Sequence, residues 1–510
     1  MTQERLKVLL VAVNPDRFSL GLAYLHAAVL KDSRLAAQSE VRQLIYDLDE
    51  VRQHYYDLTT IVEDILSQNP SVVALSCFCW NLDLCVELCR IVSRAGPSVR
   101  LVIGGSDIHP DNADALSTFP VGTYFVFGEG EATFTELLYL FSIAREEPLL
   151  KGTARNTEHG LRIHPEKPDL LAAEAIPSPI LDGVLKYDHM SWFPAFPSVR
   201  GCPYSCSYCR WGDGGAVRVF PIARILKELQ ALSKAPLDHI WITDPIFGCD
   251  VSRDLHLIEA LRQWPRPAQF SFELHPKHIS PAICQALAQL PLRWLAVGVQ
   301  SVSPTALRRC GRDPSAENAL ESLQMLYSAL PDPSVIHIDL ILGLPGDDPE
   351  RALVSLDFLK RRFPKACFYL SLLHVLPGAR IWPESKSESW LCQQARYDYE
   401  LIAREGLDLD HTTLLKRIIL GVDFLQHPQN RAWANRAWMH AEVGFSVLAY
   451  NTGTVLARKN LHRHQTYNRQ FYFDRTFESS PGLLTHLRDE IELSLGQAHM
   501  HLAEVTRFSK

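Results

Sequence analysis

The sequence predicts an α/β protein with three parts: an N-terminal doubly wound, Rossmann-like parallel sheet, a partial (β/α)6 barrel and a mostly helical C-terminal domain. The first two are predicted because apolar strand-like runs alternate with helical segments in two separate series. A proline-rich stretch at residues 165–197 separates the series. At 510 residues, 47% of them hydrophobic, the chain can form two or three packed domains. The expected boundaries are 1–150, a linker at 151–194, 195–385 and 386–510.

The N-terminal unit is expected to bind a ligand along one edge of its sheet. Its strand-like runs lie at residues 7–13, 41–46, 72–76, 99–104 and 124–127, with a helical stretch at 20–30. Ligands of doubly wound sheets bind in the loops that follow the strands, and glycine there allows close approach of the backbone. The candidate ligand-binding residues are Asn14, Pro15, Ser19, Leu20, Gly21, Ser76, Cys77, Phe78, Trp80, Asn81, Gly104, Gly105, Ser106, Gly128 and Glu129. Tight strand-to-helix turns are the alternative explanation for any one of these loops.

The second series of alternating elements predicts the barrel. Strand-like runs lie at residues 196–200, 239–243, 269–275, 294–300, 335–343 and 367–373. Helical patterns lie between them at residues 222–233, 255–263, 281–290, 316–330 and 349–363. The active site of such a barrel lies at the carboxyl ends of its strands. The loop RGCPYSCSYCRWG comes directly after the first of them.

That loop supplies three thiolate ligands in the spacing CxxxCxxC, namely Cys202, Cys206 and Cys209. A structural zinc site is the poorer fit, because no nearby histidine or fourth cysteine completes a tetrahedron. A [4Fe–4S] cluster has four irons, so three cysteines leave one iron open to an external ligand. Three buried cysteines without a metal are the remaining alternative.

Composition and charge narrow the possible classes of protein and its cellular location. The formal net charge of −7 argues against a nucleic-acid-binding surface. No apolar run approaches the ~18 residues of a membrane span, and the N-terminus lacks the pattern of a signal peptide, so we expect a cytoplasmic protein. In that compartment the 12 cysteines indicate free thiols and a metal site instead of disulfides.

The cysteine loop and the strand ends resemble the radical S-adenosylmethionine (SAM) superfamily. Its CxxxCxxC signature follows the first barrel strand, and similar motifs recur here as ITDPIFG, FELHP, GVQS, DLILGLPGD and HVLPGARIW within residues 195–385. The resemblance implies a [4Fe–4S] cluster on the three cysteines, with SAM chelating the open iron. It also implies cofactor contacts by Tyr208, Asp244, Gln300 and Ser301.

The N-terminal unit resembles the cobalamin-binding domain of class B radical SAM enzymes. The segments NPDRFSLGLAYL, SCFCWN, IGGSDIHP and FGEGE occupy the corresponding strand ends, but the first loop lacks the histidine of the DxHxxG motif. The resemblance implies transfer of a methyl group from SAM, through methylcobalamin, to an unactivated carbon of a small-molecule or peptide substrate. A flavodoxin- or ferredoxin-type reductant is implied as well. A cobalamin-dependent oxidoreductase or cyclase and a cobalamin- and cluster-binding sensor are the alternatives.

Glu273 is the candidate catalytic residue. It is a carboxylate within an otherwise apolar strand, where charge is costly unless it is paired or bound to a ligand. The alternatives are a salt bridge to a barrel arginine, a contact to SAM, or a position close to the cluster, as in the tryptophan 2-C-methyltransferase branch that the chain also resembles. A carboxylate on the open iron would block SAM chelation and favour polar methyl transfer.

Two further regions carry weaker predictions. Cys85 and Cys89 are spaced i, i+4 in an apolar helical stretch, so with Cys77 and Cys79 they are interpreted as core residues in preference to an auxiliary cluster. Residues 390–419 are expected to be helical, and the C-terminal domain is expected to cap the barrel. The aromatic and histidine-rich stretch at 462–473 is a candidate substrate lid.

Overall fold

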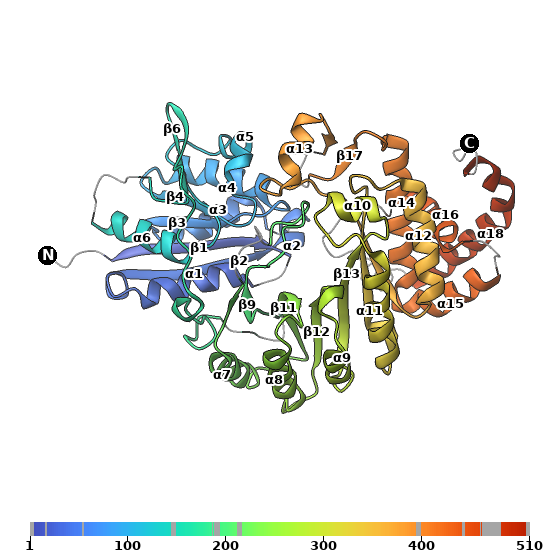
Figure 1. Ribbon diagram of the computed structural model, residues 1–510. Coiled ribbons are helices and arrows are strands. Elements are labelled where there is room, and N and C mark those ends of the chain that lie inside the picture. The colour runs from blue at the N-terminus through green and yellow to red at the C-terminus, as the bar shows by residue number, and fades with distance from the viewer. Residues whose placement is uncertain are drawn as a thin grey trace.

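The computed structural model describes residues 5–15, 18–53, 56–143, 149–185, 187, 194–211, 217–393, 399–440, 444–459, 461 and 481–505. The N-terminal sheet domain lies at one end of the molecule, the barrel in the middle and the C-terminal helices at the other end (Figure 1). The stretch at 462–473 that the sequence suggests as a lid lies outside the described residues.

The N-terminal domain is a seven-stranded sheet in the order β2-β1-β3-β4-β5-β6-β7. The first five strands are parallel, as predicted, and the last two are antiparallel. The elements are β1 (Leu6–Asn14), α1 (Leu20–Lys31), β2 (Ser39–Asp47), α2 (Leu48–Arg52), α3 (Leu58–Ser67), β3 (Val72–Ser76), α4 (Leu82–Ala95), β4 (Arg100–Gly104), α5 (Ala113–Leu116), β5 (Tyr124–Val126), α6 (Glu131–Ser142), β6 (Thr153–Thr157) and β7 (Gly160–Ile163).

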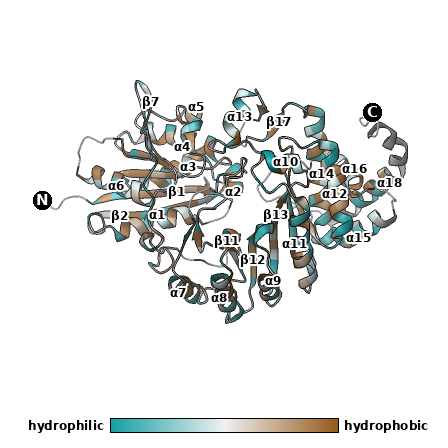
Figure 2. Cartoon of the chain, viewed as in Figure 1, coloured by the Kyte–Doolittle hydropathy of each residue, from teal (hydrophilic) through white to brown (hydrophobic). Residues whose placement is uncertain are grey.

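Alternation along β1 explains the layering of this domain. Leu9, Val11 and Val13 pack against α3 and α4 on one face of the sheet, whereas Leu10 and Ala12 face α1 and α6 on the other. Successive side chains of a strand point to opposite faces, so a strand buried on both sides is apolar throughout. Figure 2 shows hydrophobic colouring along strands of this sheet, such as β1.

The hairpin of β6 and β7 extends this sheet beyond residue 150. Both strands lie in the segment 151–194 that the sequence analysis assigns to a linker. They are short, and β7 is largely exposed, so they carry little of the apolar alternation by which strands are recognised.

The barrel is a six-stranded parallel sheet in the order β15-β14-β13-β12-β11-β8, which leaves it open between β15 and β8. Its elements are β8 (Ala195–Phe196), β9 (Val199–Arg200), β10 (Arg218–Val219), α7 (Ile222–Leu232), β11 (His239–Phe247), α8 (Val251–Arg262), β12 (Gln269–Leu274), α9 (Pro281–Leu287), β13 (Leu292–Gln300), α10 (Pro304–Arg309), α11 (Ala316–Ala329), β14 (Ile336–Leu342), α12 (Pro349–Arg362), β15 (Cys367–Leu372) and α13 (Ile381–Ser387).

The first predicted barrel strand is in fact two strands. β8 belongs to the barrel, whereas β9 pairs with β10 in a separate two-stranded ribbon. The break falls at Ser198, whose backbone N–H donates to the carboxylate of Asp244 at 2.6 Å instead of to a neighbouring strand. The barrel prediction is correct, and a buried side chain accounts for the difference in the first strand.

The C-terminal part is mostly helical, but it begins with strands. The prediction of a helix over residues 390–419 is wrong in its first half, where β16 (Leu391–Cys392) and β17 (Leu401–Ala403) pair antiparallel. The helix begins only after Asp408, whose carboxylate accepts from the backbone N–H of His411 and caps it. The helices are α14 (Leu409–Gln426), α15 (Pro428–His440), α16 (Phe445–Arg458) and α18 (Pro481–Val505).

The C-terminal helices cover the open β15 edge of the barrel and share its hydrophobic core. Gln426, at the end of α14, bonds both backbone groups of Phe368 in β15: its Nε2 donates to the carbonyl at 2.8 Å, and its Oε1 accepts from the N–H at 2.5 Å. An uncovered edge strand would present unpaired backbone groups. One side-chain amide therefore takes the place of a neighbouring strand.

We expect Gln426→Ala to lower the free energy of unfolding by about 2 kcal/mol, because two hydrogen bonds are lost and the strand edge is left unpaired. Chemical denaturation followed by circular dichroism measures this change. Gln429→Ala is the matched control, because that side chain is exposed on the neighbouring helix α15. Equal stability of the two variants would contradict the role assigned to Gln426.

Candidate functional site

Some predicted ligand residues of the N-terminal edge instead hold the edge together. Asn81 is completely buried, and its Nδ2 donates to the carbonyls of Val13 at 2.8 Å and Ser76 at 3.1 Å. Its Oδ1 accepts from the N–H of Phe78 at 2.7 Å. Asn81 thus ties the ends of β1 and β3 to the loop that follows β3.

Gly105 also has a structural role at this edge of the sheet. Its φ is +115°, and a Cβ at this position would lie 2.2 Å from the carbonyl oxygen of Cys77. Glycine is required because the loops after β3 and β4 touch backbone to backbone. Ser19 caps α1, since its Oγ accepts from the N–H of Leu22 at 3.4 Å.

Other predicted residues are open toward a ligand. The Oδ1 of Asn14 is buried, and no described residue donates a hydrogen bond to it, so a bound ligand could supply the donor. Phe78 and Trp80, in the loop that follows β3, stack with ring centroids 4.4 Å apart and are half-buried. Space around Gly21 is open, as nothing lies within 4 Å of a Cβ built there. A large planar cofactor fits an edge with these properties.

The remaining candidates differ in exposure. Pro15, Ser106 and Gly128 are exposed, Leu20 and Gly104 are half-buried, and Ser76 and Cys77 are buried at the end of β3. The structure brings these residues to the same carboxyl edge of the sheet, because they follow neighbouring parallel strands.

Glu129 joins two domains. Its carboxylate forms ion pairs with Arg218 and, at 3.6 Å, with Arg200 of the barrel domain. The neighbouring Glu131 is buried and pairs with Arg200 at 2.9 Å. Arg200 also lies over the ring of Tyr24 in α1 at 4.4 Å. The edge of the N-terminal sheet is therefore clamped to the strand that leads into the cysteine loop.

A second clamp holds the other end of that loop. Arg210 lies 4.0 Å from Asp107, which follows β4. The hydroxyl of Tyr399 donates to Asp107 at 3.4 Å and accepts from Nδ2 of Asn112 at 2.8 Å. Burial raises the pKa of Asp107 to about 6, although Arg210 acts in the opposite direction. Both ends of the cysteine loop thus contact the carboxyl edge of the N-terminal sheet.

We expect Tyr399→Phe to lower the free energy of unfolding by about 1–3 kcal/mol, because two buried polar groups lose their partner. Denaturant titration of the protein without cofactors measures it. The control is Tyr56→Phe, a change at an exposed position whose hydroxyl makes no hydrogen bond to a described residue. Stability equal to that of the control would contradict a stabilising role for the Tyr399 hydroxyl.

The cysteine loop places Cys202 and Cys206 in buried positions and Cys209 in a half-buried one. Hydrogen bonds to two other segments fix the loop: the N–H of Ser207 donates to the carbonyl of Cys310 after α10 at 3.0 Å, and its carbonyl accepts from Ile381 of α13 at 2.9 Å. Burial raises the pKa of Cys209 to about 11, so its thiolate needs a nearby positive charge such as a metal. Within the described ranges, no three His, Cys, Asp or Glu side chains converge on a site for a single ion. The three cysteines in the CxxxCxxC spacing suit a cluster, which spreads its cysteine ligands over separate irons.

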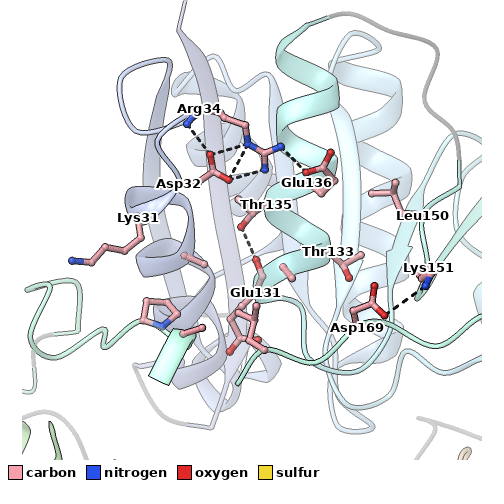
Figure 3. A pocket seen from close by; sticks show the side chains of 15 residues that line it. Lys31, Asp32, Arg34, Glu131, Thr133, Thr135, Glu136, Leu150, Lys151 and Asp169 are labelled. Carbon is pink, nitrogen blue, oxygen red and sulfur yellow. Dashed lines mark hydrogen bonds and ion pairs between the residues drawn. The ribbon is translucent and has the colours of Figure 1, made fainter. Parts of the chain in front are cut away.

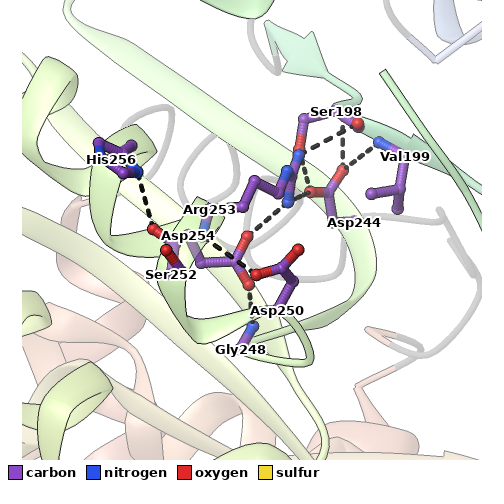
Figure 4. Close-up of polar contacts among 9 residues, drawn as sticks. All are labelled: Ser198, Val199, Asp244, Gly248, Asp250, Ser252, Arg253, Asp254 and His256. Carbon is purple, nitrogen blue, oxygen red and sulfur yellow. Dashed lines mark hydrogen bonds and ion pairs between the residues drawn. The ribbon is translucent and has the colours of Figure 1, made fainter. Parts of the chain in front are cut away.

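Asp244, a predicted cofactor contact, is engaged inside the protein (Figure 4). Its Oδ1 accepts from the N–H groups of Ser198 at 2.6 Å and Val199 at 3.1 Å, and Arg253 lies 3.5 Å from its Oδ2. Burial raises its pKa, against the lowering effect of Arg253. The contacts of Asp244 therefore position the strand that precedes the cysteine loop.

Tyr208, Gln300 and Ser301 lie around the end of β13. The hydroxyl of Tyr208 accepts a hydrogen bond at 3.1 Å from Arg312, a residue that the sequence analysis missed. Gln300 has a φ of +69°, a conformation that is rare outside glycine and is often found at functional sites. Ser301 is buried, and its Oγ donates to Asp347 at 2.8 Å.

Glu273 faces carboxylates, not an arginine. Within the described part of the chain no ion pair or hydrogen bond engages it, so the salt-bridge alternative is wrong. Burial, together with the charge of Asp244, raises the pKa of Glu273 to about 7. Asp339 on β14 was missed by the sequence analysis, and burial and Glu273 raise its pKa strongly. The sequence pattern that identified Glu273 also applies to Asp339, because Asp339 is a charged residue within an apolar strand.

Aromatic side chains lie along the same strands of the barrel. Trp241 and Trp294 meet edge to face at 5.5 Å, and Trp294 stacks on His337 at 6.3 Å. Tyr369 on β15 remains 48% exposed. Aromatic side chains on β11, β13 and β15 therefore alternate with the carboxylates of Glu273 on β12 and Asp339 on β14.

A cavity of about 530 Å³ lies elsewhere, between α1, α6 and the segment that follows residue 149 (Figure 3). Its charged side chains are already paired, since Arg34 bonds Asp32 and Glu136 at 2.8 Å and Lys151 contacts Asp169 at 3.6 Å. It contains none of the predicted site residues.

Comparison with known families agrees with this geometry. The model of the B12 binding domain matches residues 6–138, and the model of the Radical SAM superfamily matches residues 196–359. The chain belongs to the radical SAM proteins that carry a B12-binding domain. Its cofactors are therefore cobalamin for the N-terminal domain, and SAM with a [4Fe–4S] cluster for the barrel. The three cysteines begin six residues into the second match.

Two characterised relatives have similar sequences. The chain is 25% identical over 363 residues to a 2-(S-pantetheinyl)-carbapenam-3-carboxylate methyltransferase of Streptantibioticus cattleyicolor, covering 67% of this chain and 51% of that one. It is 25% identical over 357 residues to the cobalamin-dependent radical SAM methyltransferase TokK of Streptomyces tokunonensis, covering 66% and 51%. The chain thus spans about half the length of these relatives.

The fold also resembles that of the cobalamin-dependent S-adenosylmethionine radical enzyme OxsB, whose structure contains aqua-cobalamin and SAM. The TM-score is 0.67 over 99% of this chain and 81% of that one, at 14% identity. No helix among the described residues is long and apolar enough to cross a membrane.

Proposed function

We propose that the protein is a cobalamin-dependent radical SAM methyltransferase, which moves a methyl group from SAM, by way of cobalamin, to an unactivated carbon of a small-molecule or peptide substrate. The proposal rests chiefly on the two clamps, Glu129/Glu131 with Arg200 and Asp107 with Arg210. They place the cysteine loop against the edge of the cobalamin-binding domain. Similarity to two methyltransferases supports methyl transfer as the reaction class.

The residues divide between two cofactor sites. We assign the cluster to Cys202, Cys206 and Cys209, and cobalamin to the edge formed by Asn14, Phe78 and the neighbouring loop residues. The cluster with SAM supplies a radical able to remove hydrogen from an unactivated carbon, and cobalamin carries the methyl group. An external one-electron donor of the flavodoxin or ferredoxin type is required.

The protein's own residues orient the reactants and exclude water. Glu273 is the proposed catalytic carboxylate: with a pKa of about 7 its oxygens can accept or donate a proton near neutral pH. Trp241 on β11 and Trp294 on β13 meet edge to face, and these two strands flank β12, which carries Glu273. A carbon-rich substrate with a polar group fits this combination of surfaces.

The test is anaerobic incubation of the reconstituted protein with methyl-labelled SAM, a low-potential reductant and extracts of the source organism, followed by mass spectrometry. We expect S-adenosylhomocysteine, 5′-deoxyadenosine and a labelled product. The same incubation with Cys206→Ala is the control and should yield no 5′-deoxyadenosine.

The same measurement separates the alternatives. 5′-Deoxyadenosine without S-adenosylhomocysteine or labelled product would refute methyl transfer and indicate an oxidoreductase or cyclase, a class that the fold also permits. Intact SAM under strong reduction, with cobalamin and cluster both bound, would indicate a sensor.

A further inference from the structure

Arg312 contacts the cysteine loop. It follows α10, and its Nη1 lies 3.7 Å from the Sγ of Cys206 and 3.1 Å from the hydroxyl of Tyr208. Its Nη2 donates to the carbonyl of Gly298 in β13 at 2.5 Å. One guanidinium therefore connects a cysteine sulfur, the aromatic residue between two cysteines and the strand that ends at Gln300.

The charge of Arg312 is not neutralised by a carboxylate. Among the described residues none of its contacts is an ion pair with Asp or Glu, and arginine stays protonated in proteins. The side chain is only partly accessible to solvent, so water screens this charge incompletely. Its positive charge therefore acts on Cys206 and Tyr208 of the cysteine loop.

We propose that Arg312 sets the reduction potential of the cluster through the sulfur of Cys206. This rests on the proposed cluster ligands. Reduction adds one electron from an external one-electron donor and converts [4Fe–4S]2+ into [4Fe–4S]1+, so the cluster becomes more negative by one charge. A fixed positive charge and a hydrogen bond to a ligand sulfur stabilise that reduced form more than the oxidised form. Arg312 is thus a positioning residue that makes the cluster easier to reduce.

The test is a redox titration of the full-length reconstituted protein without SAM, with dithionite as reductant and the electron paramagnetic resonance signal of the reduced cluster as readout. We expect Arg312→Gln to lower the equilibrium constant for reduction at least tenfold, equal to about 59 mV for one electron. Arg312→Lys keeps the charge and should lower it less than threefold. Only assembled clusters give the signal, so partial loss of cluster does not affect the measured potential.

Arg380 provides the matched control. Its Nη1 donates to the carbonyl of Ser205 at 3.1 Å and to the Oγ at 3.0 Å, so it binds the same loop, but from an exposed position and without a contact to sulfur. Arg380→Gln should therefore leave the potential within twofold of the parent value. Tyr208→Phe, which removes the other partner of Nη1 but not the charge, should do the same.

An unchanged potential in Arg312→Gln, or an equal fall in Arg312→Lys, would overturn the proposal. So would complete loss of cluster in both Arg312 variants, since the contact would then serve assembly of the loop. A parent protein that binds no cluster would instead refute the ligand assignment. The two failures are therefore distinguishable.

Discussion

Replacing Cys206 with alanine is expected to abolish assembly of the [4Fe–4S] cluster. The loop offers three thiols, and removal of one leaves two ligands for a group that this superfamily holds with three. Iron and acid-labile sulfide per chain, together with the visible absorbance after anaerobic reconstitution, measure the effect. We expect the variant to fall to background iron content, whereas the parent protein binds one cluster per chain.

Cys310→Ala is the matched control for this experiment. Cys310 is a buried cysteine whose carbonyl holds the same loop through Ser207, but it lies outside the CxxxCxxC spacing. It should keep the cluster, because alanine preserves the backbone hydrogen bond. An unchanged iron–sulfur absorbance in Cys206→Ala, or equal loss in both variants, would contradict the ligand assignment.

The two cofactor sites should respond independently to this change. The cobalamin edge lies in the N-terminal domain, and its backbone contacts do not pass through Cys206. We therefore expect Cys206→Ala to bind cobalamin as the parent does, which also shows that the variant is folded. Joint loss of both cofactors would indicate unfolding instead of a missing ligand.

The sequence predicted where residues lie along strands better than it predicted what their side chains contact. The strand ends are positions of a regular pattern, so the five parallel strands and the six barrel strands could be placed from apolar runs alone. Asn81 and Glu129 follow the predicted strand ends, whereas Asp244 lies within β11, which continues to Phe247. Their side chains, however, bond to backbone or to arginines from other segments.

Most of the site residues that were not predicted from the sequence make contacts between segments far apart in the chain. Tyr399 meets Asp107 across 292 positions, and Arg312 meets Cys206 across 106, so no local spacing could indicate either pair. Asp339 is different, because the rule that identified Glu273 applies to it equally. A charge within an apolar strand is a local signal, and only its consequence depends on the fold: Asp244 raises the pKa of Glu273, and Glu273 raises that of Asp339.

The final prediction concerns this pair of carboxylates. The pKa of Glu273 is about 7 in the folded protein, against 4.5 for an unperturbed glutamate. The folded state therefore holds the proton more tightly than the unfolded state does, so stability falls as pH rises from about 4.5 to 7 and stays reduced above that. Each pKa unit corresponds to about 1.4 kcal/mol, so the charged form costs up to about 3 kcal/mol at pH 8.

We expect Glu273→Gln to remove this cost, because glutamine keeps the shape of the side chain without its charge. Without cofactors, the variant should unfold at higher denaturant concentration than the parent at pH 8, by up to about 3 kcal/mol in free energy, with the difference shrinking as the pH falls toward 5. Denaturant titrations at a series of pH values measure both the size and the slope. Stabilisation at pH 8 together with lost methyl transfer is the pattern expected of a catalytic carboxylate, since active sites often trade stability for function.

Glu259→Gln is the control, because the pKa of Glu259 is shifted in the opposite direction to that of Glu273. Glu259 is exposed, and its hydrogen bonds with Arg262 lower its pKa to about 2, so its removal should not stabilise the protein at pH 8. Asp339→Asn gives a second check, because the charge of Glu273 acts on Asp339, so its effect should be less than additive with that of Glu273→Gln. Destabilisation by Glu273→Gln that is the same at every pH would show that the carboxylate makes a favourable contact in the fold, and its assignment as an unpaired catalytic acid–base group would then be wrong.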